Sequence, residues 1–198
     1  MARLIEKLSD EPIALYEAKL QCYIDPSDND PEVVLNLTRL ISAARTMAEG
    51  RTWLGLLHGR YEHQLHSFPD GDIELPKSPI HEIESIKYID GGVEQTLSPD
   101  GYYEDTYSVP GIISPVTSWP AMKKRPGGVT ITYQAGYLPK PAGQDITKVI
   151  PEDIKGAILI LIKYLYDNRD GTSEKGTPSA LPKTALDILE DASARAVV

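Results

Sequence analysis

Apolar residues recur at the three- and four-residue spacing of an amphipathic helix between Pro31 and Gly50. The apolar stripe consists of Val33, Val34, Leu37, Leu40, Ile41, Ala44, Met47 and Ala48. Arg39, Arg45 and Glu49 lie largely off this stripe. The pattern therefore predicts a long helix with one apolar side and one polar side.

The same spacing returns between Pro151 and Arg169, but here the apolar surface extends almost around the helix. Its apolar positions are Ile154, Ala157, Ile158, Leu159, Ile160, Leu161, Ile162 and Leu165. A helix that is apolar on most sides is buried in its own core or against another chain. We expect this helix to pack beside the first one, with Leu37, Leu40, Ile41, Ile158, Leu161 and Leu165 in the shared core. We expect the side bearing Leu159, Ile160, Lys163 and Tyr166 to contact another subunit.

Capping residues mark the ends of the helices. Asp30 can accept a hydrogen bond from the first turn, and Pro31 has no N–H to leave unpaired, so both favour a helix start at this point. Shorter helices are predicted at Leu15–Cys22 and Lys183–Arg195. Ala14 precedes the first of these without a capping hydroxyl, which predicts fraying at its start.

Between Leu56 and Tyr137 the helical spacing gives way to short runs of strand-forming residues, separated by turns rich in Gly, Pro and Asp. The predicted strands are Arg60–Phe68, Asp72–Leu75, Ile83–Ile89, Glu94–Leu97, Tyr102–Glu104, Gly111–Ile113 and Val129–Gln134. We expect an antiparallel meander, in which each strand pairs with the next one along the chain.

The order of these elements predicts an α+β fold, with a helical bundle core of about four helices and an inserted antiparallel β lobe. Residues 1–55 and 150–198 would form the helical core, and residues 56–149 the β lobe. We interpret Trp53 and Trp119 as core side chains and Cys22 as a buried structural cysteine.

Composition narrows the classes of function. The chain has 198 residues, with 20 Lys and Arg against 29 Asp and Glu and a formal net charge of −9. This acidity argues against wrapping nucleic acid, because phosphate binding depends on a basic face. The longest wholly apolar run, Ala157–Ile162, has six residues, far fewer than the about 20 that span a bilayer. The first residues lack the apolar stretch of a secretory signal, so we expect neither secretion nor membrane insertion.

The sequence contains no strong motif for catalysis or metal binding. His63 and His66, with Glu62, are the nearest approach to a metal site, but positions three apart in a strand face opposite sides. A zinc site also needs three or four converging ligands. Cys22 is the only cysteine, which excludes an internal disulfide. We expect no enzyme activity, no cofactor and no metal.

Seven short segments are more informative through their order than singly. They are EPIALYEAK (Glu11–Lys19), ISAARTMAEGRTW (Ile41–Trp53), IELPKSPIHEIESIKYIDGG (Ile73–Gly92), TLSPDGYY (Thr96–Tyr103), the pair Trp119-Pro120, GGVTITYQAGY (Gly127–Tyr137) and IPEDIKGAILILIKYLYDNRD (Ile150–Asp170). In this order they resemble the head–tail connector (adaptor) family of long-tailed bacteriophages and gene transfer agents, in the branch with a β-rich insertion. The likeness covers about Glu11 to Leu189.

The resemblance implies a structural virion subunit rather than an enzyme. Connectors of this kind form a homo-oligomeric ring, usually of twelve copies, below the portal protein at the head–tail junction. They carry a head-completion (stopper) protein or a tail protein, and double-stranded DNA passes through their channel without specific binding. An acidic chain suits such a channel, since like charge removes the attraction behind non-specific DNA binding. Assembly would take place in the cytoplasm of a bacterial host, with no membrane contact.

The resemblance also implies that the C-terminal portion, about Leu181–Val198, docks on the portal. This portion offers a narrow apolar strip made of Leu181, Ala185, Leu186, Leu189 and Ala192. A short strip of this kind is weakly stable alone and gains order in a partner's groove. The polar loop Asp170–Pro182 would let the helix move away from its bundle. The alternative is that this helix completes the protein's own four-helix core.

Two other functions stay open on the sequence alone. A head-completion or tail-terminator protein would also form a ring without catalysis, and affinity for the portal would separate it from a connector. A carbohydrate- or host-binding module would use the β lobe, where Tyr102, Tyr103 and Tyr107 could line a binding face. Sugar binding by the lobe would favour this second alternative.

Overall fold

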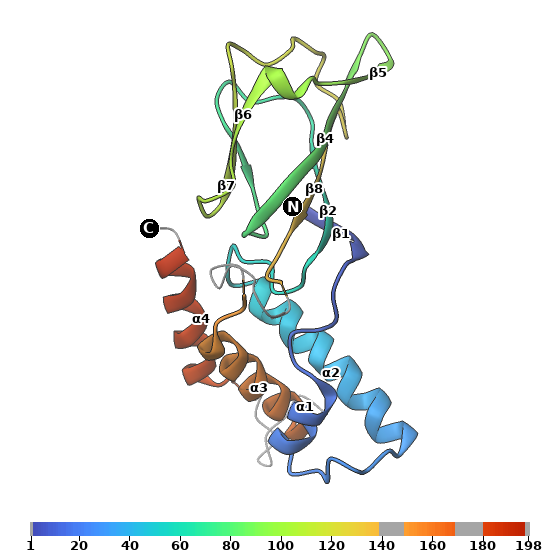
Figure 1. Cartoon of the computed structure of the whole chain (residues 1–198), viewed down its shortest axis with the longest axis vertical. Coiled ribbons are helices and arrows are strands. Elements are labelled where there is room, and N and C mark those ends of the chain that lie inside the picture. Colours follow the sequence, from blue (N-terminus) through green and yellow to red (C-terminus); the bar gives the residue numbers. More distant parts are fainter. Residues whose placement is uncertain (1, 139–148, 169–179, 197–198) are drawn as a thin grey trace. The chain divides into compact units, whose positions relative to one another are not determined.

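The protein is seen in a computed structural model, which describes residues 2–138, 149–168 and 180–196. Over this part of the chain the fold is α+β, with four α helices and antiparallel sheets. The chain divides into two compact units (Figure 1). A β unit comprises residues 1–10, 53–149 and 196–198, and a helical unit comprises residues 11–52 and 150–195. Most of the predicted Asp170–Pro182 loop lies outside the described residues.

The β unit has a five-stranded sheet of order β1-β2-β8-β4-β5 and a three-stranded sheet of order β3-β7-β6. The strands are β1 Ala2–Lys7, β2 Gly59–Leu65, β3 Ile73–Leu75, β4 Ile80–Asp90, β5 Val93–Thr96, β6 Tyr102–Asp105, β7 Gly111–Pro115 and β8 Val129–Ala135, with a 3-10 helix at Pro99–Gly101. The sheets face each other (Figure 1), and buried side chains from both form one core between them.

Strand β8 shows how alternation sets the buried face of this unit. Val129, Ile131, Tyr133 and Ala135 are all fully buried, and the residues between them are less so. β8 lies between β2 and β4, at the centre of its sheet. The predicted meander is therefore wrong for β2, which pairs with β8 rather than with the next strand. Alternation determines which face of a strand is buried, but not which strand lies beside it.

Strand β1 was not predicted, and it brings the first residues of the chain into the β unit. Leu4 packs against the core, and Arg3 pairs with Glu62 of β2 at 3.2 Å. A register shift after Leu4 leaves Ile5 in a bulge, 43% exposed. The strand is short and rich in charge, so its alternation spans too few residues to be recognised in the sequence.

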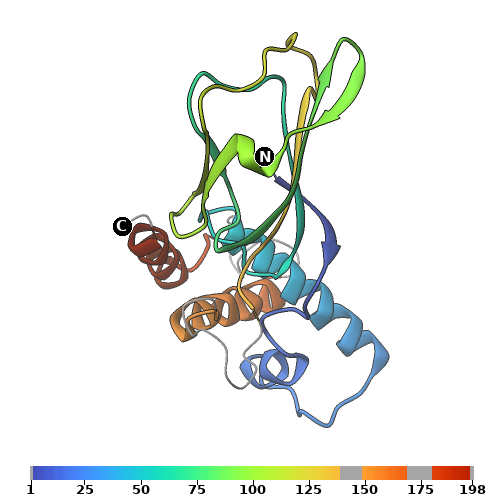
Figure 2. The same ribbon diagram turned by 45° about the horizontal axis from the view of Figure 1, so that its top comes forward.

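The helical unit contains α1 Leu15–Gln21, α2 Pro31–Glu49, α3 Glu152–Asp167 and α4 Lys183–Ala196. α2 packs against α3, and α1 packs against both (Figures 1 and 2). This confirms the predicted pairing of the two long helices. Their shared side is buried at Leu37, Ile41, Ile158 and Leu161 and half-buried at Leu40 and Leu165.

The helix starts follow from local capping. Asp30 accepts a hydrogen bond from the Glu32 N–H at 2.8 Å, and Pro31 is the first residue of α2, as predicted. At α1 the Glu17 carboxylate accepts the Ala14 N–H at 2.7 Å. This bond is half of a capping box. It gives the Ala14 N–H a partner, whereas the Ala14 methyl group cannot accept a hydrogen bond from the first turn of the helix.

Arg45 and Glu49 of α2 are buried, although they lie off the apolar stripe. The Arg45 Nε lies 2.7 Å from Glu11 Oε2, and its Nη1 lies 3.1 Å from Glu49 Oε2. Only 8% of the Arg45 side chain and 6% of the Glu49 side chain are exposed. Mutual pairing lets these charges occupy a buried position. The covered side of α2 is therefore wider than its apolar stripe.

The sequence predicts buried positions for Trp53, Trp119 and Cys22, and the structure shows a different degree of burial for each. Trp53 is 44% exposed, so the prediction that it is a core side chain is wrong. Trp119 is half-buried and packs against the core of the β unit. Cys22 is buried and free, which confirms the prediction of a buried cysteine.

Candidate functional site

The side of α3 that was predicted to contact another chain is half-buried in the structure at Leu159, Ile160, Lys163 and Tyr166. The Lys163 Nζ lies 2.6 Å from Asp167 Oδ1 and 5.3 Å from the centre of the Tyr23 ring. The Asp167 carboxylate raises the pKa of the Lys163 ammonium. This ammonium therefore joins the side of α3 to the end of α1. The contact of these four residues with another subunit stays a prediction.

Helix α1 presents an apolar side outward, a feature that the sequence analysis missed. Tyr16 is 58% exposed, Leu20 is 55% exposed and Tyr23 is 89% exposed. Tyr16 and Leu20 are four residues apart and therefore lie on one side of α1. Tyr23 follows in the turn beyond the last helical residue, Gln21. We call these three residues the α1 face. The pattern of this short helix covers only two turns, too few for the three- and four-residue repeat to be recognised in the sequence.

A second outward row lies on α2. Leu35 is 52% exposed, and Arg39, one turn further along, is also exposed. Leu37 and Ile41, two residues beyond each of them, are buried. In a helix a shift of two residues turns a side chain to almost the opposite side. Leu35 and Arg39 therefore point away from the side of α2 that packs on the rest of the unit. We call them the α2 row.

The apolar strip of α4 is mostly covered within this chain. Ala185, Leu189 and Ala192 are buried, whereas Leu181 and Leu186 are half-buried. The Pro182 carbonyl accepts the N–H groups of Ala185 and Leu186 and so closes the first turn. Burial of three of the five residues supports the alternative in which α4 completes the protein's own core. Docking of this strip on a portal stays a prediction, with Leu181 and Leu186 as its accessible part.

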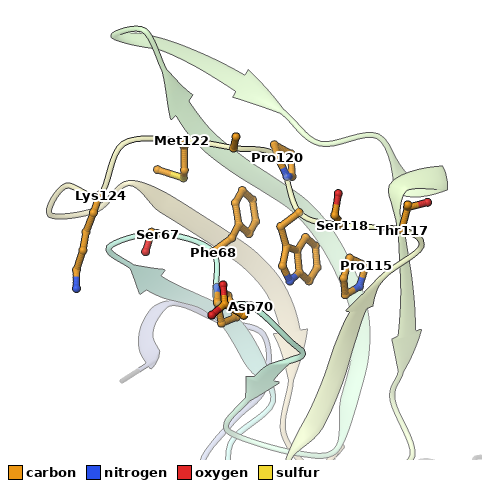
Figure 3. A pocket seen from close by; sticks show the side chains of 12 residues that line it. Ser67, Phe68, Asp70, Pro115, Thr117, Ser118, Pro120, Met122 and Lys124 are labelled. Atoms are coloured by element: carbon orange, nitrogen blue, oxygen red, sulfur yellow. The ribbon is translucent and has the colours of Figure 1, made fainter.

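The β unit carries a pocket of about 390 Å³ beside two stacked aromatic rings (Figure 3). The Phe68 and Trp119 ring centres are 5.0 Å apart and their planes differ by 6°. The Trp119 Nε1 donates to the Gly71 carbonyl at 2.7 Å, which fixes the orientation of the indole. Pro115 and Pro120 add apolar wall, and further lining comes from Ser67, Pro69, Asp70, Thr117, Ser118, Ala121, Met122 and Lys124.

The tyrosines proposed as a binding face of the β lobe do not share one surface. Tyr102 and Tyr103 are consecutive in β6, so their side chains point to opposite faces of the sheet. Tyr102 packs against the core, and burial raises its pKa, whereas Tyr103 is 66% exposed. Tyr107 lies beyond the strand and is 95% exposed. The aromatic surface of this unit that is shaped as a pocket is the Phe68–Trp119 pair instead.

The titratable side chains that the structure describes do not converge on a metal site. Among the described residues, no group of three or more His, Cys, Asp and Glu side chains could hold a metal ion. His63 is buried and His66 is exposed, as expected of positions on different sides of the chain. No helix within the described ranges has the length and apolar character needed to cross a membrane.

Comparison with known proteins gives similarity in structure alone. No protein-family model matches the chain, and no curated protein matches it. A chain in the neck of an empty GTA particle with C6 symmetry matches with a TM-score of 0.70 at 21% identity, covering 96% of this chain and 94% of that one. A chain in the virion of a native gene transfer agent (GTA) particle gives 0.68 at 21% identity, with the same coverage.

A third structure, the neck of a native GTA particle with C12 symmetry, contains a chain that matches with a TM-score of 0.64 at 22% identity. This match covers 96% of the present chain and 93% of the other. Because the coverage is nearly complete, the likeness includes both the helical unit and the β unit. At this level of identity it establishes a common fold. The protein therefore has the fold of chains found in the neck and virion of gene transfer agent particles.

Proposed function

We propose that this protein is a structural subunit of a head–tail neck, and more narrowly a connector (adaptor) that forms a ring below the portal. The single observation that supports the proposal most is the fold likeness to chains of gene transfer agent necks over almost the whole chain. Those necks were computed with C6 or C12 symmetry, which agrees with a ring of identical subunits. In the proposal about twelve copies extend the DNA channel and join the head to the tail.

The partners in this proposal are the portal above the ring and a stopper or tail protein below it. Leu181 and Leu186 are the accessible residues of the proposed portal-docking strip. The net charge of −9 disfavours adhesion of the DNA that passes through the channel. The protein acts by packing and position, without catalysis, cofactor or metal. It joins the particle in the cytoplasm of the bacterial host.

Electron microscopy of the particle tests this proposal. A short peptide tag placed in the exposed turn at Gly91-Gly92, between β4 and β5, adds a label without entering either core. Labelling with an antibody fragment against the tag should add a ring of density at the neck, with the symmetry of the neck. Label on the capsid surface, on the tail tip or nowhere on the particle would refute the proposal.

A second candidate function has one specific observation in its favour. The Phe68–Trp119 pocket combines aromatic and proline walls with the hydroxyl of Ser118 and the carboxylate of Asp70, the mixture that small-ligand sites use. A carbohydrate- or host-binding module would use this pocket. A glycan array probed with the protein and with Trp119→Ala tests it, since specific binding that the substitution removes would support this candidate. A head-completion or tail-terminator ring differs from the connector in lacking affinity for the portal.

A further inference from the structure

The α1 face exposes three large side chains on a helix of only seven residues. Exposed apolar residues that occur singly need no explanation, but a contiguous group of them marks an interaction site. Tyr16 and Leu20 are neighbours on α1, Tyr23 follows in the turn that ends it, and each of the three exposes more than half of its surface. Tyrosine also belongs to the residue types enriched in the cores of protein interfaces.

The backbone at Tyr23 provides a second, independent observation. Its φ angle is 59°, in the left-handed region that favours glycine. Tyr23 occupies the turn that ends α1, where the Ile24 N–H donates to the Lys19 carbonyl at 2.9 Å. Glycine is the usual residue at this position of a helix end. The chain holds a tyrosine there instead and leaves it 89% exposed, which is the combination expected of a residue kept for contact rather than for folding.

The α2 row has a side-chain chemistry that is complementary to the α1 face. Leu35 is an exposed apolar group, and the Arg39 guanidinium is an exposed cation one turn away. A guanidinium stacks on the face of an aromatic ring, so Arg39 can pair with tyrosine while Leu35 packs on Leu20. The two surfaces face away from the packed interior of the same unit. Both surfaces are exposed in a single copy, so neither covers the other there.

We propose that the α1 face of one copy binds the α2 row of a second copy of this chain. Two unlike surfaces on one molecule make a head-to-tail contact, which closes into a ring when the rotation between copies allows it. Lys163, which already contacts the Tyr23 ring, lies at the edge of this contact and would connect it with the outer side of α3. The inference rests on the proposed function as a ring subunit, and it names the surfaces by which the subunits meet.

Cysteine cross-linking on the portal-bound protein tests the contact. The double variant Leu20→Cys/Leu35→Cys should give a ladder of disulfide-linked dimers, trimers and larger species on oxidation. Leu20→Cys and Leu35→Cys alone, which keep the buried Cys22, should stay monomeric in a denaturing gel. A double variant that assembles on the portal without a ladder would overturn the contact and leave the proposed function standing. Equal amounts of dimer from either single variant would overturn the head-to-tail pairing. Failure of the unaltered protein to form a ring on the portal would refute the proposed function, and the contact with it.

Tyr23→Gly separates association from folding. Because glycine suits the left-handed turn, the variant should keep the melting temperature of the unaltered protein or exceed it. Its ring formation should need at least about tenfold more protein, as expected when an aromatic anchor of an interface is removed. Tyr107→Gly is the matched control, since it removes an equally exposed tyrosine from the β unit and should assemble normally. Assembly of Tyr23→Gly at the same concentration as the unaltered protein would contradict the inference.

Discussion

Arg45 is a buried cation that connects two segments of the helical unit. Its guanidinium contacts two carboxylates, Glu11 ahead of α1 and Glu49 at the end of α2. The Ser42 hydroxyl accepts a third, longer bond of 3.4 Å from Nη2. A single cation thus links the segment before α1 to the last turn of α2.

Replacing Arg45 by leucine should destabilise the protein by about 3 kcal/mol, because it removes the cation that contacts the buried Glu49 carboxylate and the half-buried Glu11 carboxylate. Urea unfolding followed by circular dichroism measures the loss. Arg39→Leu is the matched control on the exposed side of α2 and should change stability by about 0.5 kcal/mol or less. Equal effects of the two substitutions would show that the Arg45 pairs contribute little.

The His58 and His81 imidazoles in the β unit give the protein a pH dependence. Their ring centres are 5.0 Å apart in an edge-to-face arrangement, and the His81 Nε2 donates to the Gly136 carbonyl at 2.7 Å. Burial, and secondarily the charge of a protonated His81, lower the pKa of His58 from its usual 6.5. The folded state therefore takes up a proton at His58 less readily than the unfolded chain does.

Stability contributed by neutral His58 should be lost as the pH falls below about 6.5, the usual histidine pKa, because the unfolded chain binds the extra proton first. Urea unfolding at several pH values should show a decline that is smaller in His58→Gln. His66→Gln, at an exposed position, should leave the decline unchanged. The same slope in His58→Gln as in the unaltered protein would exclude His58 as its source.

At the scale of elements, the packing of α2 on α3 is the feature that the sequence predicts best. Both helices have long apolar stripes, and Leu161 at the centre of α3 is 1% exposed. Leu161→Ala should lower the free energy of unfolding by about 2–5 kcal/mol through loss of buried surface and the cavity it leaves. Leu159→Ala, on the half-buried side of the same helix, should cost less. A loss below about 0.5 kcal/mol for Leu161→Ala would contradict the packing.

Helix α4 offers a test that separates docking from folding. Leu181 and Leu186 are half-buried, and Leu189 is fully buried. The double variant Leu181→Ser/Leu186→Ser should weaken binding to the portal with little change in melting temperature. Leu189→Ser should instead lower the melting temperature, because this substitution places an unpaired hydroxyl in the core. Portal pull-down and thermal melts measure the two effects. Normal portal binding by the double variant would exclude these leucines as the docking element.

What the sequence could and could not predict follows from the range of each interaction. A turn is encoded by the few residues that form it, so the sequence could locate the strands from β2 to β8 to within a few residues. Pairing of β2 with β8 joins Tyr61 to Tyr133, and no local pattern encodes such a distance. β1 could not be recognised because it is short and half of its residues are charged. The burial of Arg45 depends on Glu11, a partner outside the helix, and the α1 face depends on which side of α1 the other helices cover.

At the scale of the whole molecule, one chain combines two units of different construction. The β unit is held by a core between two sheets, and the helical unit is held by α1, α2 and α3. The likeness to neck chains covers both units, so the proposed role uses the chain as a whole. The contacts proposed between copies all lie on the helical unit, so the Phe68–Trp119 pocket of the β unit takes no part in them.

The mass of the complex with the portal tests the central proposal most directly. The protein is mixed with the portal from the same source, and native mass spectrometry or mass photometry measures the portal with and without it. The account predicts that the portal gains a single defined mass, equal to a complete ring of about twelve copies of this 21.8 kDa chain, with few partly filled rings. A portal that gains no mass, or the mass of one copy only, would contradict the account.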